Sequence, residues 1–228
     1  MLPSIWAKAM HRNFFYLLNI KVMKKLFVLM AACLMTLAAS AQDAVGTLSL
    51  KPMVGMTIAN VVGEDADGTD PKLGLIAGGE LIYQASEIFA LSGGLLYSMQ
   101  GCAGDGGLKM KLDYVNVPLM GNLYVAKGLA LKAGLQLGIL TKAKASMKEG
   151  GVSADVDVKD AMNSLDLSIP IGISYDINNS FVIEGRYNFG MTKIGKKSYS
   201  FMGEHFTDDE NNVRNSVIQL TLGYKFAL

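Results

Sequence analysis

Charged and hydrophobic residues alternate in the stretch NSFVIEGRYNFGMTKI, residues 179–194. Reading every second residue places Glu184 and Arg186 in one set and the large residues Ile183, Tyr187 and Phe189 in the other. Successive side chains of a β-strand point to opposite faces, so the stretch predicts a strand with one polar and one apolar face. A carboxylate and a guanidinium on one face can form an ion pair.

The same register, carried along the chain, places four basic and four acidic residues on polar strand faces. These are Lys51, Glu80, Lys132, Asp166, Asp176, Glu184, Arg186 and Lys225. The two signs balance, and charges in a narrow interior are tolerated only when they are paired and hydrogen-bonded. We therefore expect a structural network that fills the lumen of a closed sheet. The alternative is a narrow channel for small solutes or ions, with these residues as its lining.

An acidic segment, GEDADGTDPK at residues 63–72, could supply oxygen ligands to a calcium ion. Its candidate ligands are Asp65, Asp67 and Asp70. The spacing differs from that of an EF-hand loop, which has glycine at position six and glutamate at position twelve. We therefore predict a solvated loop and no metal site.

A second segment, GEHFTDDE at residues 203–210, carries the only histidine after residue 42. His205 beside Asp208, Asp209 and Glu210 could activate a water molecule for hydrolysis. No second histidine follows residue 42, and no serine nucleophile lies in a recognised motif. We predict that the protein is not an enzyme and uses no cofactor. Cys102, in the glycine-rich segment GCAGDGG, is expected to be an exposed loop thiol.

Period-two alternation recurs along the chain, and we find no convincing amphipathic helix after Gln42. Eight strands are expected, at residues 47–59, 73–84, 88–100, 110–125, 128–142, 163–177, 179–194 and 213–226. Short turns at 85–87, 126–128 and 178–179 alternate with long polar links at 60–72, 101–109, 143–162 and 195–212. Short turns at one end and long loops at the other are typical of an outer-membrane barrel. The sequence therefore predicts an all-β, eight-stranded, antiparallel up-and-down transmembrane β-barrel.

The composition of the two strand faces indicates which one meets lipid. The polar faces are rich in Gly, Ser, Thr, Asn and Gln, which suit the inside of a narrow closed barrel. The apolar faces carry Leu, Ile, Val and Phe, with Tyr near strand ends, as in a lipid-facing band with an aromatic girdle. A soluble lipid-carrying barrel is the alternative, but its outer face should carry many Lys and Glu.

Bulk composition agrees with this interpretation. Half of the 228 residues are hydrophobic and 18% are charged, whereas about 25% is usual in soluble domains. The net charge of +1 gives no indication of a nucleic-acid partner.

The N-terminal region predicts export. Residues 23–41, MKKLFVLMAACLMTLAASA, have a basic head, a short apolar run and small residues before a cleavage site, as in a secretory signal peptide. A membrane anchor is the alternative, although the run is short for a span. We expect residues 1–22 to be an over-called N-terminal extension and residues 42–228 to form the barrel domain. The export route would be the general secretion pathway.

The chain resembles the PorT-like outer-membrane β-barrel family. The stretches that carry the resemblance are YVNVPLMGNLYV (114–125), NSLDLSIPIGISYDI (163–177), EGRYNFGMTKI (184–194) and QLTLGYKF (219–226). The resemblance implies an eight-stranded barrel whose last strand ends in an aromatic residue, here Phe226, that the barrel-assembly machinery reads. It also implies contact with outer-membrane lipid. We expect a structural or surface-interaction role, with a protein or surface ligand meeting the long extracellular loops.

Overall fold

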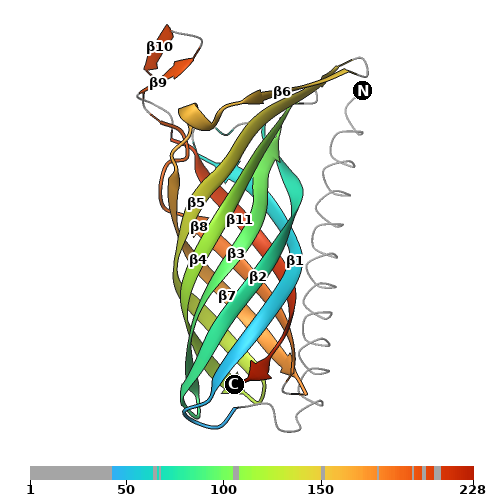
Figure 1. Cartoon of the computed structure of the whole chain (residues 1–228), viewed down its shortest axis with the longest axis vertical. Coiled ribbons are helices and arrows are strands. Elements are labelled where there is room, and N and C mark those ends of the chain that lie inside the picture. The colour runs from blue at the N-terminus through green and yellow to red at the C-terminus, as the bar shows by residue number, and fades with distance from the viewer. Residues whose placement is uncertain are drawn as a thin grey trace, which may run out of the picture. The chain divides into compact units, whose positions relative to one another are not determined.

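The computed structural model describes residues 43–228, except for 64, 65, 67, 105–107, 150–151, 179, 197, 202–203 and 208–211 (Figure 1). The expected extension at 1–22 and signal peptide at 23–41 lie outside the described residues. Within the part described, the structure contains no helix that is both long enough and apolar enough to span a membrane.

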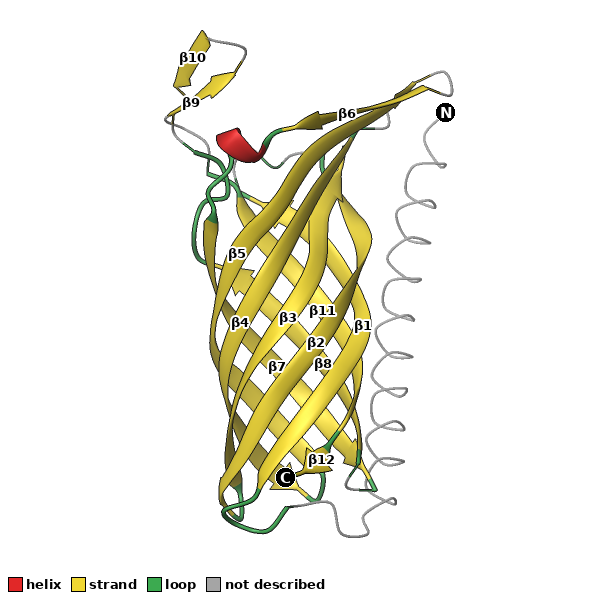
Figure 2. Cartoon of the chain, viewed as in Figure 1, coloured by secondary structure: helices red, strands yellow, loops and turns green. Residues whose placement is uncertain are grey.

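Eight long strands form one closed antiparallel sheet. They are β1 (Leu48–Val62), β2 (Asp70–Ser86), β3 (Phe89–Ala103), β4 (Lys109–Ala126), β5 (Leu129–Glu149), β7 (Leu165–Ile177), β8 (Phe181–Gly190) and β11 (Arg214–Tyr224). Their order in the sheet is β11-β8-β7-β5-β4-β3-β2-β1, and β1 also pairs with β11. The short β12 (Phe226–Ala227) continues β11 along β1. This closure confirms the predicted eight-stranded up-and-down barrel (Figure 2).

The strands extend into segments that we expected to be long loops. Within 143–162, β5 runs on and folds back as β6 (Val152–Asp157), followed by the 3-10 turn η2 (Lys159–Ala161). Within 195–212, β9 (Ser198–Phe201) pairs with β10 (Glu204–Thr207) as a separate hairpin. At about 3.3 Å per residue, the 21 residues of β5 reach roughly 70 Å, well beyond a hydrocarbon core of about 30 Å even when tilted.

The two ends of the barrel differ as the sequence predicts. β2 and β3, β4 and β5, and β7 and β8 are joined by connections of two or three residues. The C-terminus lies at this short-turn end, where the Leu228 amide donates to the Leu48 carbonyl at 2.8 Å (Figure 1). β6, β9 and β10 lie at the opposite, long-loop end (Figure 1).

The alternation of side chains follows the predicted register. In β8, Val182, Glu184, Arg186 and Asn188 are buried, whereas Phe181, Ile183 and Phe189 on the other face are exposed. Across the barrel the exposed set includes Leu73, Leu95 and Leu119, which are 71%, 61% and 65% exposed. Large hydrophobic side chains in such numbers on the outer face need an apolar solvent, and a bilayer supplies one.

Glycines on the polar faces permit the sheet to close tightly. A Cβ at Gly134 would lie 2.0 Å from the backbone oxygen of Leu119, and one at Gly55 would lie 2.0 Å from that of Leu220. Both positions exclude any side chain unless the backbone moves. These contacts agree with the predicted role of small residues inside a narrow barrel.

Pro118 and Pro170 both point into the barrel and are buried. The β3–β4 ladder is interrupted beside Pro118 and the β5–β7 ladder beside Pro170, and pairing resumes in the same register. A proline lacks the N–H that the ladder would use, and the loss is confined to one side of each strand.

Candidate functional site

The most concentrated polar site is a group of five charged side chains in the barrel interior, here called the central cluster. Its members are Lys51 from β1, Glu80 from β2, Lys132 from β5, and Glu184 and Arg186 from β8. Each is 3% exposed or less. Lys51 and Glu80 are direct partners in the β1–β2 ladder, whereas β5 and β8 bring their residues from other sides of the barrel.

Two carboxylates share three cations in the central cluster. The Lys51 ammonium lies 2.9 Å from Glu80 Oε2 and 2.7 Å from Glu184 Oε2. The Lys132 ammonium lies 3.0 Å from Glu184 Oε2 and 3.4 Å from Glu80 Oε2. Arg186 donates through Nε to Glu184 and through Nη2 to Glu80. The cluster therefore crosslinks four strands through charge-assisted hydrogen bonds.

A second polar group lies at the short-turn end. The Lys225 ammonium is 2.6 Å from Asp176 Oδ2 and 3.2 Å from Asp43 Oδ2. The Ser49 hydroxyl also donates to Asp43 at 3.1 Å. Asp43 was missed by the sequence reasoning because it precedes the first strand, where strand alternation gives no signal.

Asp166 belongs to a third group, toward the long-loop end. Its carboxylate accepts hydrogen bonds from Asn215 Nδ2 at 3.0 Å and from the Thr192 hydroxyl at 2.7 Å. Asn215 also donates to the Tyr114 hydroxyl oxygen at 3.2 Å. The eight predicted residues are therefore all buried. Their direct ion pairs and hydrogen bonds fall into three groups along the barrel.

An apolar cluster lies inside the barrel at the long-loop end. Its buried members are Val61, Cys102, Leu112, Tyr114, Leu140, Ala143 and Ile194. The expectation of an exposed loop thiol at Cys102 is therefore wrong, since this residue is in β3 and 8% exposed.

Residues 40–196 match the family described as outer membrane protein beta-barrel domain. The chain belongs to this family. The membership and the closed barrel place the protein in the outer membrane of a Gram-negative bacterium, as a small integral barrel.

Several solved barrels are similar to this member of the family. Ail, the attachment invasion locus protein of Yersinia pestis, crystallised with the heparin analogue sucrose octasulfate, is 17% identical over 80% of this chain and 100% of its own, with a TM-score of 0.48. Neisserial surface protein A is 15% identical over 78% and 97%, with a TM-score of 0.46. OprG from Pseudomonas aeruginosa is 14% identical over 83% and 99%, with a TM-score of 0.41. No curated protein sequence matches the chain.

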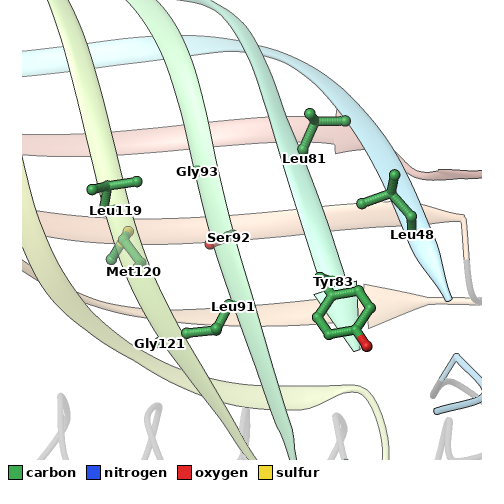
Figure 3. A pocket seen from close by; sticks show the side chains of 9 residues that line it. All are labelled: Leu48, Leu81, Tyr83, Leu91, Ser92, Gly93, Leu119, Met120 and Gly121. Carbon is green, nitrogen blue, oxygen red and sulfur yellow. The ribbon is translucent and has the colours of Figure 1, made fainter. Parts of the chain in front are cut away.

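The outer face of this family member has a shallow apolar groove near the short-turn end (Figure 3). It exists because two outward-facing positions, Gly93 in β3 and Gly121 in β4, have no side chain among the surrounding leucines. The residues that line it are Leu48, Leu81, Tyr83, Leu91, Ser92, Gly93, Leu119, Met120 and Gly121. This largely apolar lining suits a lipid acyl chain.

The long-loop end carries basic side chains on β4 and β5. Lys111 is opposite Lys144 in the ladder, and Lys142 is opposite Asp113, with 3.9 Å between their charged atoms. Asp155 of β6 lies 3.6 Å from the Lys111 ammonium. The Ser146 hydroxyl, which donates to Asp155, lowers the pKa of this carboxyl, and Lys111 adds to the effect.

The other candidate sites lie mostly outside the described residues. Asp65 and Asp67 of the acidic segment, and Asp208, Asp209 and Glu210 beside His205, are not among them, while Asp70 begins β2. The backbone of His205 pairs with Ser200 in the β9–β10 hairpin. Among the described residues, no group of three or more His, Cys, Asp or Glu side chains is placed to hold a metal ion.

Proposed function

We propose that the central cluster fills the lumen, and that this outer-membrane barrel has a structural or surface-interaction role exerted through its long-loop end. The observation that carries the proposal is the burial of five paired charges, from β1, β2, β5 and β8, in the middle of the interior. An eight-stranded barrel has an interior only wide enough for side chains to fill. Ion pairs that bridge its walls leave a solute no continuous path.

Apolar side chains support the same proposal on both sides of the charges. The cluster of Leu112, Leu140 and their neighbours lies above the central cluster, toward the long-loop end. Ile82, Ala90, Tyr124 and Ala130 form another apolar cluster toward the short-turn end. The proposed role is not enzymatic and needs no cofactor.

The surface for a protein or other surface ligand would be the long-loop end, where β5 and β6 continue beyond the bilayer. Loops and hairpins on a rigid barrel are suitable binding elements because the scaffold fixes their base. Exposed basic residues on this surface, such as Lys109 and Lys142, favour a partner with anionic groups.

The proposal extends to biogenesis. We infer export through the general secretion pathway, with removal of residues 23–41, and assembly that depends on the terminal strand ending at Phe226. This strand pairs with β1 through β11 and β12, so it closes the barrel. The PorT-like resemblance of the sequence supports the same route.

A narrow channel is the second candidate, and one observation favours it. Several buried amide groups in the barrel interior, among them those of Asn188 and Gln219, have atoms without a partner among the described residues. Such atoms are typical of a lumen that admits water.

Planar-bilayer recording separates the two candidates. The wild-type barrel should show no steady ohmic current. In a second experiment on intact cells, photocrosslinkers at the exposed Met147 or Lys159 should capture a partner. A photocrosslinker at Lys127, in a short turn, is the control. A steady wild-type current that is abolished in Glu184→Ala and Arg186→Ala would instead establish the channel.

A further inference from the structure

One guanidinium nitrogen of Arg186 takes no part in the ion pairs of the central cluster. Nε donates to Glu184 and Nη2 donates to Glu80. Nη1 is buried and has no hydrogen-bond partner among the residues that the structure describes. A guanidinium N–H without a partner in a low-dielectric interior is costly, so this donor favours a ligand that accepts hydrogen bonds and carries negative charge.

Two further amide side chains come from positions that neighbour Arg186 in the sheet. Gln219 in β11 is directly opposite Arg186 in the β8–β11 ladder, and Asn188 is two residues along β8 on the same inward face. Opposite residues have Cβ atoms about 4.5–5.5 Å apart, and residues two apart on one strand are separated by about 6.6 Å. Both side chains are 2% exposed or less, and their amide nitrogens have no partner within the described part of the chain.

The charges around this point are not balanced. The central cluster has three cations, Lys51, Lys132 and Arg186, against the carboxylates of Glu80 and Glu184. The group of Asp43, Asp176 and Lys225, which lies toward the short-turn end, has an excess of negative charge. Asn188 lies on the long-loop side of Arg186, and Gln219 lies opposite Arg186 on the neighbouring strand.

We propose that a small monovalent anion of the chloride type binds inside the barrel, held by Arg186 Nη1 and the amide N–H groups of Asn188 and Gln219. The excess positive charge supplies the attraction, and the three donors supply the contacts. The oxygens Asn188 Oδ1 and Gln219 Oε1, which also lack partners among the described residues, accept from water that accompanies the ion. The site exists whether or not the barrel conducts, so it is independent of the function proposed above.

The size of the ligand follows from the surroundings. An eight-stranded barrel has an interior only wide enough for side chains to fill, so a single halide is expected rather than a tetrahedral oxyanion. Chloride and bromide are therefore the appropriate probes, and gluconate, which is too large for the interior, is the substitute anion.

Two measurements test the site on the whole barrel in detergent. The first is the thermal midpoint of unfolding as chloride replaces gluconate at constant ionic strength. A specific site gives a saturating rise, because an ion that binds only the folded state stabilises it in proportion to ln(1 + [L]/Kd). The second is anomalous scattering from crystals grown in bromide, with a peak expected beside the Arg186 guanidinium.

The variants Asn188→Leu and Gln219→Met remove the donors while preserving volume and leave the ion pairs of Arg186 in place. Together they should abolish the chloride-dependent rise. Gln136→Met is the matched control, since this buried glutamine donates to the Ser168 hydroxyl at 3.3 Å and should leave the rise unchanged.

A flat chloride titration of the wild type would overturn the proposal, and would assign the unpartnered donors to water alone. A rise that survives in the double variant would also overturn it, because the ion would then bind elsewhere. A bromide peak without any chloride dependence in solution would mean an adventitious ion only. If the double variant fails to fold, the wild-type titration and the position of the bromide peak still decide.

Discussion

Replacing Glu80 by glutamine removes one of the two carboxylates that hold three buried cations together. Glu80 accepts from Lys51 at 2.9 Å, from Lys132 at 3.4 Å and from Arg186. In the Glu80→Gln variant, three cations would share Glu184 alone. Removing one partner of a buried ion pair costs about 3–5 kcal/mol because it leaves an uncompensated charge away from water.

The assay is thermal unfolding of the refolded barrel in detergent, followed by the heat-dependent shift of its band on gels and by circular dichroism. For a chain of this size, a loss of about 3–5 kcal/mol lowers the midpoint by about 6–20 °C. The matched control is Asp155→Ala, which breaks the exposed pair with Lys111 at 3.6 Å. An exposed ion pair contributes at most about 1 kcal/mol, so this midpoint should hardly move.

A second variant tests the stated cause. Adding Lys132→Met to Glu80→Gln restores the wild-type excess of one positive charge, so the double variant should regain a substantial part of the lost stability. The reasoning is refuted if Glu80→Gln loses no more stability than Asp155→Ala. It is also refuted if the Lys132→Met and Glu80→Gln losses simply add, because groups in one charge network must couple.

Three further predictions concern the wall and the long-loop end. Leu135→Arg, on the outer face of β5, should destabilise the barrel by about 2–4 kcal/mol in urea unfolding with lipid vesicles; a neutral effect would mean that this face does not meet hydrocarbon. Gly134→Ala should lower the free energy of unfolding by about 1–3 kcal/mol, because its Cβ would lie 2.0 Å from the Leu119 oxygen. The control Gly185→Ala, whose Cβ would have its nearest atom at 3.5 Å, should change this free energy by less than about 0.5 kcal/mol. Equal losses in the two variants would contradict the close-approach argument. Asn215→Leu should cost about 1–3 kcal/mol, since it removes the donor to the Tyr114 hydroxyl and one of the two donors to Asp166, and an unchanged thermal midpoint would argue against that polar group.

The barrel could be predicted from the sequence because its decisive signal is local. Whether Glu184 faces inward and Ile183 outward depends only on their positions along one strand, and the closed barrel places both as expected. Closure follows from the same pattern, because an apolar outer face in lipid leaves no place for an unpaired edge.

The grouping of the interior charges could not be predicted in this way. Glu80 and Glu184 are 104 positions apart and meet because the stagger of the strands brings them to one level of the barrel. Asp166 and Lys132 share an inward face but lie at different levels, so Asp166 is bound by Asn215 and Thr192 instead. The two-residue alternation of a strand identifies the face on which a residue lies, but it contains no information about the position of that residue along the barrel axis.

The early end predicted for β5, at residue 142, has a physical cause that also locates the membrane boundary. On the short-turn side of Leu140, the outer face of β5 is apolar, as at Ile139, and its inner face is polar, as at Gln136. From Leu140 toward the long-loop end the pattern inverts, because Leu140 is buried inside while Lys142 is exposed. An irregularity in the β4–β5 register accompanies the change, between the pairs of Asp113 and Tyr114. A strand that leaves lipid for water must exchange its outer apolar side chains for charged ones. The inversion therefore marks the outer surface of the bilayer, and the strands beyond it form the part of the barrel that a partner can reach.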